Sequence, residues 1–435
     1  MSLFNSLATA VSGMTAQGRA IANISDNVAN SQTTGYKRLD TSFEDMVINA
    51  GTSRYTGGVV ANTVATNDVQ GTISQVDNPL ALALSGRGFF SVARPIAGGT
   101  EGMAFDSRAM FTRAGDFSLN SQGYMQNGSG DVLQGWRVDP ATGTPDMTSL
   151  SPIRIDRASL PPEPTEAVTL SANLPASAEA GATGSTRAQV YDQLGNLHPV
   201  DLGWTRGEAE NSWTLAVTRP AAGSGAATEL GTFTVTFGTN GAPAGTIGAV
   251  LDADGNTVGR YDPANPANAL LNVTGSFGGA DQTIGIDLGR FGSTAGVTQY
   301  GGSAYELRSV QRDGGPAGAF ASVTTQADGK VVVNYDNGES RTVAQVPVVT
   351  FADPDALERL DGQAFALTQE AGRQQVSAIG ANGTGTLQAG AIEGSNVDIA
   401  AEFSKLIVAQ RSYSANAKLV TTADELLQET VNLKR

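Results

Sequence analysis

The sequence predicts a mainly β fold with α-helical termini, in which concentric, discontinuous domains are nested between one helix at each end. Two observations support this architecture. Apolar residues recur at helical spacing over long stretches near the two ends of the chain, whereas the middle is rich in Gly and the chain has only 6% aromatic residues. Such a middle is typical of many short strands and turns. We therefore expect terminal helices that form a coiled-coil-like core, with two β-rich domains between them.

The first expected element is a helix from about Leu3 to Asn30, which forms the N-terminal part (1–30) of the terminal helical core domain. Its apolar residues follow a heptad spacing with a few adjoining positions, so the helix has one apolar stripe. The stripe consists of Leu3, Leu7, Val11, Met14, Ile21, Ile24 and Val28. Because a heptad stripe is a seam for other helices, we interpret these residues as a self-assembly seam.

A compact motif follows this helix and consists of Ala29, Asn30, Gly35, Tyr36 and Lys37. Asn30 can cap the helix end, and Gly35 permits a left-handed turn of the backbone. Tyr36 and Lys37 offer an aromatic and a charged anchor. By itself, the motif indicates no more than the end of a helix. The Ser-, Thr-, Asn- and Gly-rich residues 31–75 then predict an extended connector with short strands at best.

Two β domains are expected in the middle of the chain. Short apolar runs separated by Asn-Gly-type turns predict a first β domain over 76–144, which resumes over 296–379. The prolines from Pro152 to Pro164 mark the crossing to an inserted outer β domain over 145–295. Within it, Asp252–Asn256 predicts a hairpin turn, because its Gly comes too early for a calcium loop and no acid closes the loop.

The chain returns through a second connector, 380–395, to the C-terminal part (396–435) of the helical core domain. Ser395 or Asn396 can cap this last helix, and Asp398 is favourable in its first turn. Its apolar stripe steps by threes, fours and sevens, and we interpret it as the second half of the self-assembly seam. The residues are Phe403, Leu406, Tyr413, Ala417, Val420, Leu427 and Val431.

Composition argues against catalysis. Without Cys the chain has no disulfide, thiolate ligand or Cys nucleophile, and the single His198 is expected in a loop or at a strand edge. Phosphate-loop, dinucleotide and zinc-helix motifs are absent from the sequence. Trp136, Trp204 and Trp213 are expected in the core rather than on a sugar-binding platform. We therefore predict a protein that is not an enzyme and has no catalytic residue, cofactor or metal site.

The charge distribution indicates which partners to expect. The net charge of −15 lies between two nearly neutral ends, and an acidic body repels nucleic acid. No run of about 18 apolar residues predicts membrane insertion. The first basic residue is Arg19, so a cleavable signal peptide is not expected. Near-neutral ends suit the crowding of many copies, which makes a second copy of the chain the expected partner.

Several segments together resemble the flagellar rod–hook family of axial proteins. Besides the motif at 29–37, the similar blocks are Ser42–Val47, Gly86–Phe90, Phe111–Phe117, Gly123–Asn127, Glu393–Asp398, Ile407–Arg411 and Leu433–Lys434. Within the family, Tyr191–Asn196, Ala344–Phe351 and the large insertion favour the hook branch over the shorter rod subunits. Ala81 departs from the family pattern, which usually has Asp there.

The resemblance implies a structural subunit that self-assembles into a curved, flexible tube, the hook, which couples motor torque to the filament as a universal joint. It implies a helical homopolymer, with distal-rod, hook-cap and hook–filament junction proteins as further partners. It also implies passage through the flagellar type III export apparatus to an extracellular place in the flagellum. Phe4 with Leu7 or Ala8 is then a candidate for recognition by the export gate, or belongs only to the seam.

Three alternatives stay open from the sequence. A distal-rod-type subunit follows the same assembly logic but is rigid and lacks much of the insertion. An extracellular β-rich carbohydrate-binding protein or enzyme would use the middle of the chain, with the helices as anchors. A secreted adhesin would show a signal peptide or repeats, and the sequence has neither.

Overall fold

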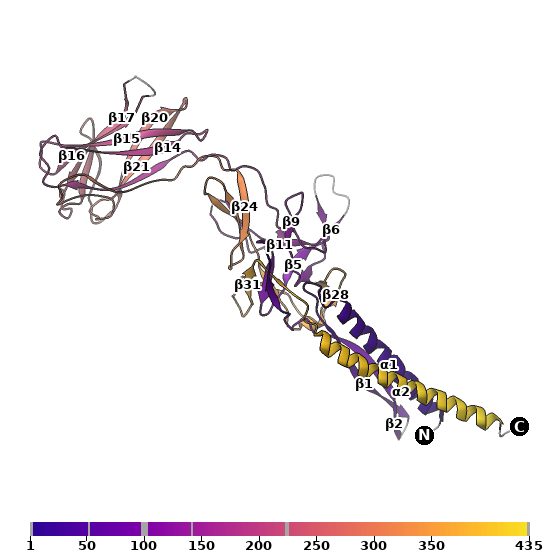
Figure 1. The fold of residues 1–435 in the computed structure, drawn as a ribbon. Coiled ribbons are helices and arrows are strands. Elements are labelled where there is room, and N and C mark those ends of the chain that lie inside the picture. The colour runs from indigo at the N-terminus through magenta and orange to yellow at the C-terminus, as the bar shows by residue number, and fades with distance from the viewer. Residues whose placement is uncertain (1–2, 51–52, 97–102, 141, 222–225, 433–435) are drawn as a thin grey trace. The chain divides into compact units, whose positions relative to one another are not determined.

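The computed structural model describes residues 3–50, 53–96, 103–140, 142–221 and 226–432. The chain forms two compact units, and the first is discontinuous. Unit 1 consists of Met1–Arg157, Ala321–Asn334 and Ser340–Arg435, and unit 2 of Ala158–Phe320 and Tyr335–Glu339. Figure 1 shows the helices at the two ends of the chain and the strands between them. The predicted mainly β fold with α-helical termini is confirmed.

The terminal helices belong to unit 1, where they pack against each other. α1 spans Leu3–Ala29 and α2 spans Ile399–Asn432. Beside them, β1 (Leu39–Ala50) and β2 (Ser53–Ala65) form an antiparallel hairpin that packs on α1. Figure 1 shows the two helices and this hairpin side by side. Each end of the chain therefore has a partner surface within its own subunit.

The hairpin corrects one prediction. Residues 31–75 were expected to be an extended connector with short strands at best, yet β1 and β2 pair along their whole length with one bulge at Met46/Val47. The alternation of apolar and polar residues here is weak, because the hairpin is held largely by polar contacts to α1. Arg19 Nη1 donates to Ala61 O at 2.9 Å, and Asn23 Nδ2 donates to Thr41 Oγ1 at 2.8 Å.

The β body of unit 1 is an 11-stranded sheet with several small strand pairs around it. Its main path is β24 (Phe320–Thr325), β25 (Lys330–Tyr335), β26 (Ser340–Gln345), β11 (Val132–Arg137), β5 (Phe90–Ala93), β8 (Met110–Thr112), β29 (Ala364–Ala366) and β28 (Glu358–Arg359), joined by β9 (Ser118–Leu119), β10 (Met125–Gln126) and β12 (Ser151–Pro152). The small pairs are β3 (Ile73–Gln75) with β32 (Ala391–Glu393), β4 (Leu82–Ser85) with β31 (Thr386–Ala389), β27 (Val348–Thr350) with β30 (Gln375–Ser377), and β6 (Pro95–Ile96) with β7 (Ala104–Phe105). A short 3-10 helix, η1, spans Pro354–Ala356. In one buried core of this β body, the rings of Phe89, Phe351 and Phe365 pack edge to face.

The pairs β3–β32 and β4–β31 join segments from opposite ends of the chain. They bring the residues before α2 against the residues that follow the hairpin. The second connector predicted at 380–395 is therefore paired β structure for part of its length.

Unit 2 is built from two sheets around one core. A 5-stranded sheet contains β20 (Asn268–Phe277), β21 (Ala280–Arg290), β13 (Ala167–Pro175), β22 (Val297–Tyr300) and β23 (Glu306–Arg312). A 6-stranded meander runs through β14 (Thr183–Tyr191), β15 (Leu197–Arg206), β16 (Ser212–Arg219), β17 (Thr228–Phe237), β18 (Ile247–Asp252) and β19 (Thr257–Arg260). Apolar residues of both sheets meet in one buried cluster, as in a β-sandwich.

The boundaries of the insertion differ from the predicted 145–295. Unit 2 begins at Ala158 because β12, at Ser151–Pro152, still pairs with β11 of unit 1. It extends to Phe320 because β22 and β23 both pair with β13. These pairings join residues more than a hundred positions apart, which turn-rich sequence alone does not reveal.

Three smaller predictions are confirmed. Trp136, Trp204 and Trp213 are buried, so they offer no exposed platform for a sugar. Asp252–Asn256 forms the turn between β18 and β19, with Asn256 N donating to Asp252 Oδ1 at 2.7 Å. His198 lies near the start of β15, where its Nε2 is 2.9 Å from Asp192 Oδ2.

Candidate functional site

The candidate site is the surface of the paired terminal helices, together with the polar contacts that hold their bases. The helices run antiparallel: Gly13 of α1 lies against Asn416, while Asn27 lies against Glu402. A Cβ at Gly13 would come within 2.7 Å of Asn416 Nδ2, so a larger residue there would require the Asn416 side chain to move. Six of the buried residues of the two helices are small, namely Ala10, Gly13, Ala16, Ala20, Ala409 and Ala423, and the larger buried ones are Asn23, Ile24, Asn27 and Glu402.

The predicted seam residues lie at different depths in the single subunit. Of the predicted seam residues, Ile24 is buried, whereas Val11, Phe403 and Tyr413 are exposed. Half-buried members of the seam are Leu7, Met14, Ile21, Val28, Leu406, Ala417, Val420 and Leu427. The side chains of Leu3, Phe4 and Val431 lie outside the described part of the chain. On α2, the half-buried Leu406, Val420 and Leu427 lie three or four positions from the buried Glu402, Ala409 and Ala423, so large and small side chains share one face of the helix.

Further large apolar side chains are exposed on α2. Besides Phe403, they include Ile407, Val408, Leu419 and Leu426, each at least half exposed. Between α1, β1 and α2 lies a groove of about 420 Å³, with Ile24, Leu39 and Val408 among its lining residues. An apolar groove next to exposed apolar side chains is the kind of surface that another protein covers.

At the base of the helices, the side chain of Asn27 hydrogen-bonds to several segments of the chain, a role that the sequence did not reveal. It is fully buried, and its Nδ2 donates to Leu39 O at 2.8 Å and to Glu402 Oε2 at 3.0 Å. Its Oδ1 accepts from Leu39 N at 2.9 Å and from Tyr36 Oη at 3.2 Å. All four hydrogen-bonding positions of the amide are therefore used. One side chain joins α1, β1, α2 and the motif at 29–37.

Glu402 of α2 is the charged partner of Asn27 in this set of hydrogen bonds. Its side chain is 1% exposed, and its second oxygen, Oε1, accepts from Lys405 Nζ at 2.9 Å. Lys405 Nζ also donates to Asp40 Oδ1 of β1 at 2.7 Å. A buried carboxylate is tolerated when it is paired and hydrogen-bonded in this way. The heptad pattern did not indicate Glu402, because pattern analysis searches for apolar residues.

The motif at 29–37 ends α1 and turns the chain toward the hairpin. Ala29 is the last helical residue, and Asn30 Nδ2 donates back to Asp26 O at 2.9 Å. Gly35 has φ +70°, and a Cβ there would lie 2.4 Å from Ala114 N. The predicted left-handed turn is confirmed. Tyr36 is buried, with the Arg359 guanidinium 4.7 Å from the centre of its ring.

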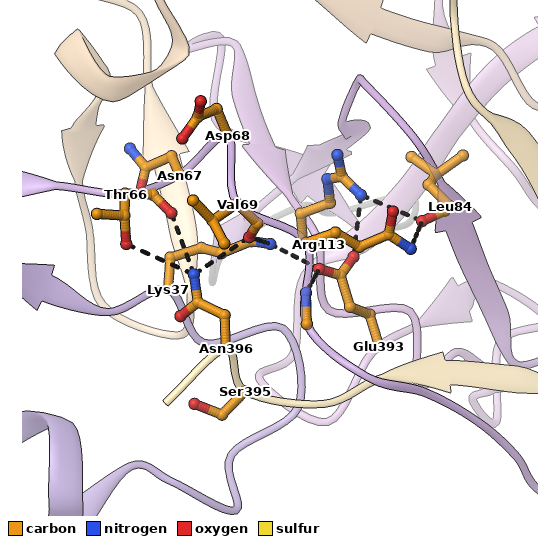
Figure 2. A network of polar contacts seen from close by, with 12 residues as sticks. Lys37, Thr66, Asn67, Asp68, Val69, Leu84, Arg113, Glu393, Ser395 and Asn396 are labelled. Carbon is orange, nitrogen blue, oxygen red and sulfur yellow. Dashed lines mark hydrogen bonds and ion pairs between the residues drawn. The ribbon is translucent and has the colours of Figure 1, made fainter. Parts of the chain in front are cut away.

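Lys37, the last residue of the motif, enters a buried ion cluster with Arg113 and Glu393. Figure 2 shows the three side chains converging from segments far apart in the sequence. Lys37 Nζ lies 2.6 Å from Glu393 Oε1, and Arg113 Nη1 lies 2.9 Å from Glu393 Oε2. Each side chain is at most 1% exposed. The predicted charged anchor thus has a partner 356 positions away.

Backbone groups add further hydrogen bonds to this ion cluster, although Arg113 Nε is buried without a hydrogen-bond partner among the described residues. Lys37 Nζ donates to Val69 O at 2.7 Å, and Gly71 N donates to Glu393 Oε1 at 2.8 Å. Arg113 Nη2 donates to Gly86 O at 2.6 Å. Burial lowers the pKa of both Lys37 and Arg113, and the charge of Glu393 opposes this shift. One carboxylate therefore compensates two buried cations.

Asn396 corrects a second prediction. Ser395 or Asn396 was expected to cap α2, but Asn396 Oδ1 accepts from Arg38 N at 2.7 Å. Its Nδ2 donates to Thr66 O at 3.2 Å, and both of these residues are labelled in Figure 2. Asp398 caps the helix instead, because its Oδ1 accepts from Ala400 N at 2.9 Å and Ala401 N at 3.1 Å. Asn396 is committed to the link between the two ends of the chain, which a local capping rule does not consider.

Within the described ranges, no group of three or more His, Asp or Glu side chains is placed to hold a metal ion. Neither of the two described helices has the length and apolarity that crossing a membrane requires.

Ala81, which departs from the family pattern, keeps its turn through backbone bonds: Ala81 N donates to Asn78 O at 3.1 Å, and Gly390 N donates to Ala81 O at 2.8 Å. The chemistry of the site is therefore that of packing and of buried polar contacts.

Four family models match the chain, and together they span most of it. They are the flagella basal body rod protein (residues 7–37), the flagellar hook protein FlgE/F/G D1 domain (83–173), the flagellar basal body protein FlaE D2 domain (156–314) and the flagellar basal body rod FlgEFG protein C-terminal (388–433). The D2 match lies close to the Ala158–Phe320 segment of unit 2, and the C-terminal match includes all of α2 and the strand β32 just before it.

Proteins with the name flagellar hook protein FlgE are similar over the full chain. The one from Brucella abortus is 32% identical over 440 residues, covering 100% of both chains. That of Caulobacter vibrioides is 26% identical, again covering 100% of both, and that of Salmonella typhimurium is 27% identical, covering 99% of this chain and 100% of that one. The crystal structure of the Helicobacter pylori flagellar hook protein FlgE2 matches with a TM-score of 0.53 at 12% identity, covering 72% of this chain and 99% of that one. This last match concerns the fold.

Proposed function

The chain belongs to the flagellar hook protein FlgE family, and on this premise we propose that it is the structural subunit of the bacterial flagellar hook. The observation that carries the proposal is the full-length similarity to hook proteins, at 32% identity with complete coverage. The family is structural, and we infer that this chain has no enzymatic activity. Copies of it assemble into a curved, flexible tube that couples the motor to the filament.

The main partner in this proposal is a second copy of the chain. The exposed apolar residues of α2 and the half-buried stripe of α1 supply the contact, because the single subunit leaves them wholly or partly uncovered. Burying such side chains between copies contributes about 1.5–3 kcal/mol for each large residue that becomes fully covered. A surface that repeats on every copy and pairs unlike faces generates an open helical array.

Unit 2 suits weaker contacts between copies. In residues 158–320, acidic side chains outnumber basic ones about two to one, so neighbouring copies repel each other mildly. A tube that bends must lengthen on one side and shorten on the other, and weak polar contacts can exchange as it does. We assign cohesion to the helices and adjustable contacts to unit 2.

The remaining partners rest on the family alone. We propose that the ends of the tube meet distal-rod, hook-cap and hook–filament junction proteins, and that the chain reaches the outside through the flagellar type III export apparatus. Phe4, Leu7 and Ala8 are the proposed recognition residues for export. Ala8 is exposed and Leu7 is half-buried in the structure.

Electron microscopy of the purified protein under polymerising conditions tests the proposal. The full chain should form tubes, and a variant that lacks Ala158–Phe320 should form thinner, straighter tubes, because the terminal helices and the ion cluster remain. Straight, rigid tubes from the full chain would favour the distal-rod alternative. If the full chain forms no tube at all, the assembly role is refuted.

A further inference from the structure

The helix pair presents an imbalance that packing of apolar surface alone does not explain. The inner face carries small buried residues such as Ala409 beside half-buried larger ones such as Leu406 and Val420, while Ile407 and Val408 are half exposed or more. Turning α2 about its own axis would bring these exposed side chains against α1. That rotation would cover the exposed Ile407 and Val408, which is favourable, and would expose the half-buried Leu406 and Val420 in exchange.

The strongest polar contact between the two helices opposes this rotation. Asn27 Nδ2 donates to Glu402 Oε2 at 3.0 Å, and both residues are buried. Turning α2 would separate them and leave the buried amide of Asn27 without its charged acceptor. Losing a hydrogen bond to a charged group shifts an equilibrium by roughly tenfold to a hundredfold. In coiled coils, a buried Asn has a similar effect, since it selects one arrangement at a cost in stability.

We propose that the Asn27–Glu402 contact sets the rotation of α2 on α1, and thereby keeps the large apolar side chains of α2 facing outward. Both are positioning residues. Without them α2 would be free to turn until Ile407 and Val408 face α1, and less of that exposed surface would remain for a second copy. That consequence for assembly rests on the proposed function, whereas the rotation itself concerns the single subunit. The contact thus favours an assembly-competent subunit over one in which Ile407 and Val408 are covered.

Cysteine labelling tests the rotation directly, because the natural chain has no Cys. Val408 and Ala409 are adjacent, yet Val408 is 64% exposed and Ala409 is 5% exposed. In the parent chain, Val408→Cys should react rapidly with a thiol reagent and Ala409→Cys slowly. In the Asn27→Leu/Glu402→Leu background, Val408→Cys should become at least about tenfold slower and Ala409→Cys faster.

Two matched variants serve as controls. Asn23→Leu removes another buried Asn of α1, one that donates to Thr41 and Thr63 of the hairpin, and should leave labelling at both positions unchanged. Glu402→Gln keeps an acceptor for Asn27 and should preserve the parent pattern. A disulfide between Gly13→Cys and Asn416→Cys, which face each other in the structure, should form in the parent and be lost in the double-Leu background.

Each outcome decides the question. Unchanged labelling in the double-Leu background overturns the proposal, because the rotation would then be set elsewhere. Rapid labelling at both positions also overturns it, since the contact would then hold the helices together rather than orient them. The labelling is measured on the monomer and does not depend on tube formation. If Val408→Cys becomes slow and Ala409→Cys fast in the double-Leu background while tubes still form, the role of the contact in setting the rotation stands and its link to assembly is refuted.

Discussion

Replacing Glu393 by Gln should destabilise unit 1 selectively. Glu393 is the one carboxylate between Lys37 and Arg113, with oxygen–nitrogen distances of 2.6 and 2.9 Å and side chains at most 1% exposed. The neutral amide would leave two buried cations without a counter-charge. Breaking a buried ion pair by removing one partner costs about 3–5 kcal/mol. Since urea unfolding has slopes of about 1–3 kcal/mol/M, the midpoint of unit 1 should fall by at least about 1 M.

Tryptophan fluorescence separates the two units in this experiment. Trp136 reports on unit 1, while Trp204 and Trp213 report on unit 2, and all three are buried. In a Trp204→Phe/Trp213→Phe background, the remaining signal follows unit 1. With Trp136→Phe instead, the signal follows unit 2 and should not respond to Glu393→Gln. The two backgrounds therefore localise the loss of stability.

The matched control is Glu425→Gln, the same change at an exposed position of α2. It should alter stability by no more than about 0.5 kcal/mol, as exposed substitutions usually do. Adding Lys37→Met to Glu393→Gln should recover part of the lost stability, because one unpaired cation is removed. A midpoint for Glu393→Gln that equals that of Glu425→Gln would refute the reasoning, since the cluster would then contribute nothing to the fold.

Three further predictions concern assembly and pH. Removing residues 1–28 or 399–435 should leave a folded β body that forms no tubes, as judged by circular dichroism and electron microscopy; tubes from either truncation would contradict the role of the helices. Ile21→Asp and Val420→Asp, at half-buried positions, should each place an unpaired charge in the contact between copies and abolish swimming, with normal motility as the contrary result. Burial works to raise the pKa of Asp192, but hydrogen bonds from His198 and its own turn hold this pKa well below the usual range. Its stabilising contribution to unit 2 is therefore present above about pH 4 and lost as the pH falls further. In pH titrations of unit 2 unfolding, Asp192→Asn should be less stable at neutral pH and flatter below pH 4; identical curves would exclude this role.

The order and type of the terminal elements were predictable because they depend on local periodicity. The heptad recurrence of Leu7, Met14 and Ile21 predicts a helix, and α1 ends one residue before the predicted Asn30. Gly35 was assigned a left-handed turn from its place after the helix, which its φ of +70° confirms. These signals lie within a few residues of each other, so no tertiary information is needed to interpret them.

Other features depend on which distant segments meet. The long pairing of β1 with β2 was not predicted, because its support comes from polar side chains of α1 such as Arg19 and Asn23 rather than from an apolar alternation. The limits of unit 2 follow from strand pairings across the insertion. A turn-rich sequence indicates strands, but it does not indicate their neighbours.

By itself, the sequence determined that the chain has a helix at each end, a β-rich middle, no Cys chemistry and the pattern of the rod–hook family. Only the tertiary structure decided how deeply each helical residue is buried: Ala10, Gly13 and Ala409 are buried, whereas the heptad residues Leu7, Met14 and Ile21 are half-buried. The reason is physical: helices approach closely where side chains are small, and buried polar groups must find partners wherever these lie in the chain. Lys37 pairs with Glu393, which is 356 positions away in the sequence, and Asn27 pairs with Glu402, which is 375 positions away. Each of these pairs is a single long-range contact, so it produces no repeating pattern by which the sequence alone could reveal it.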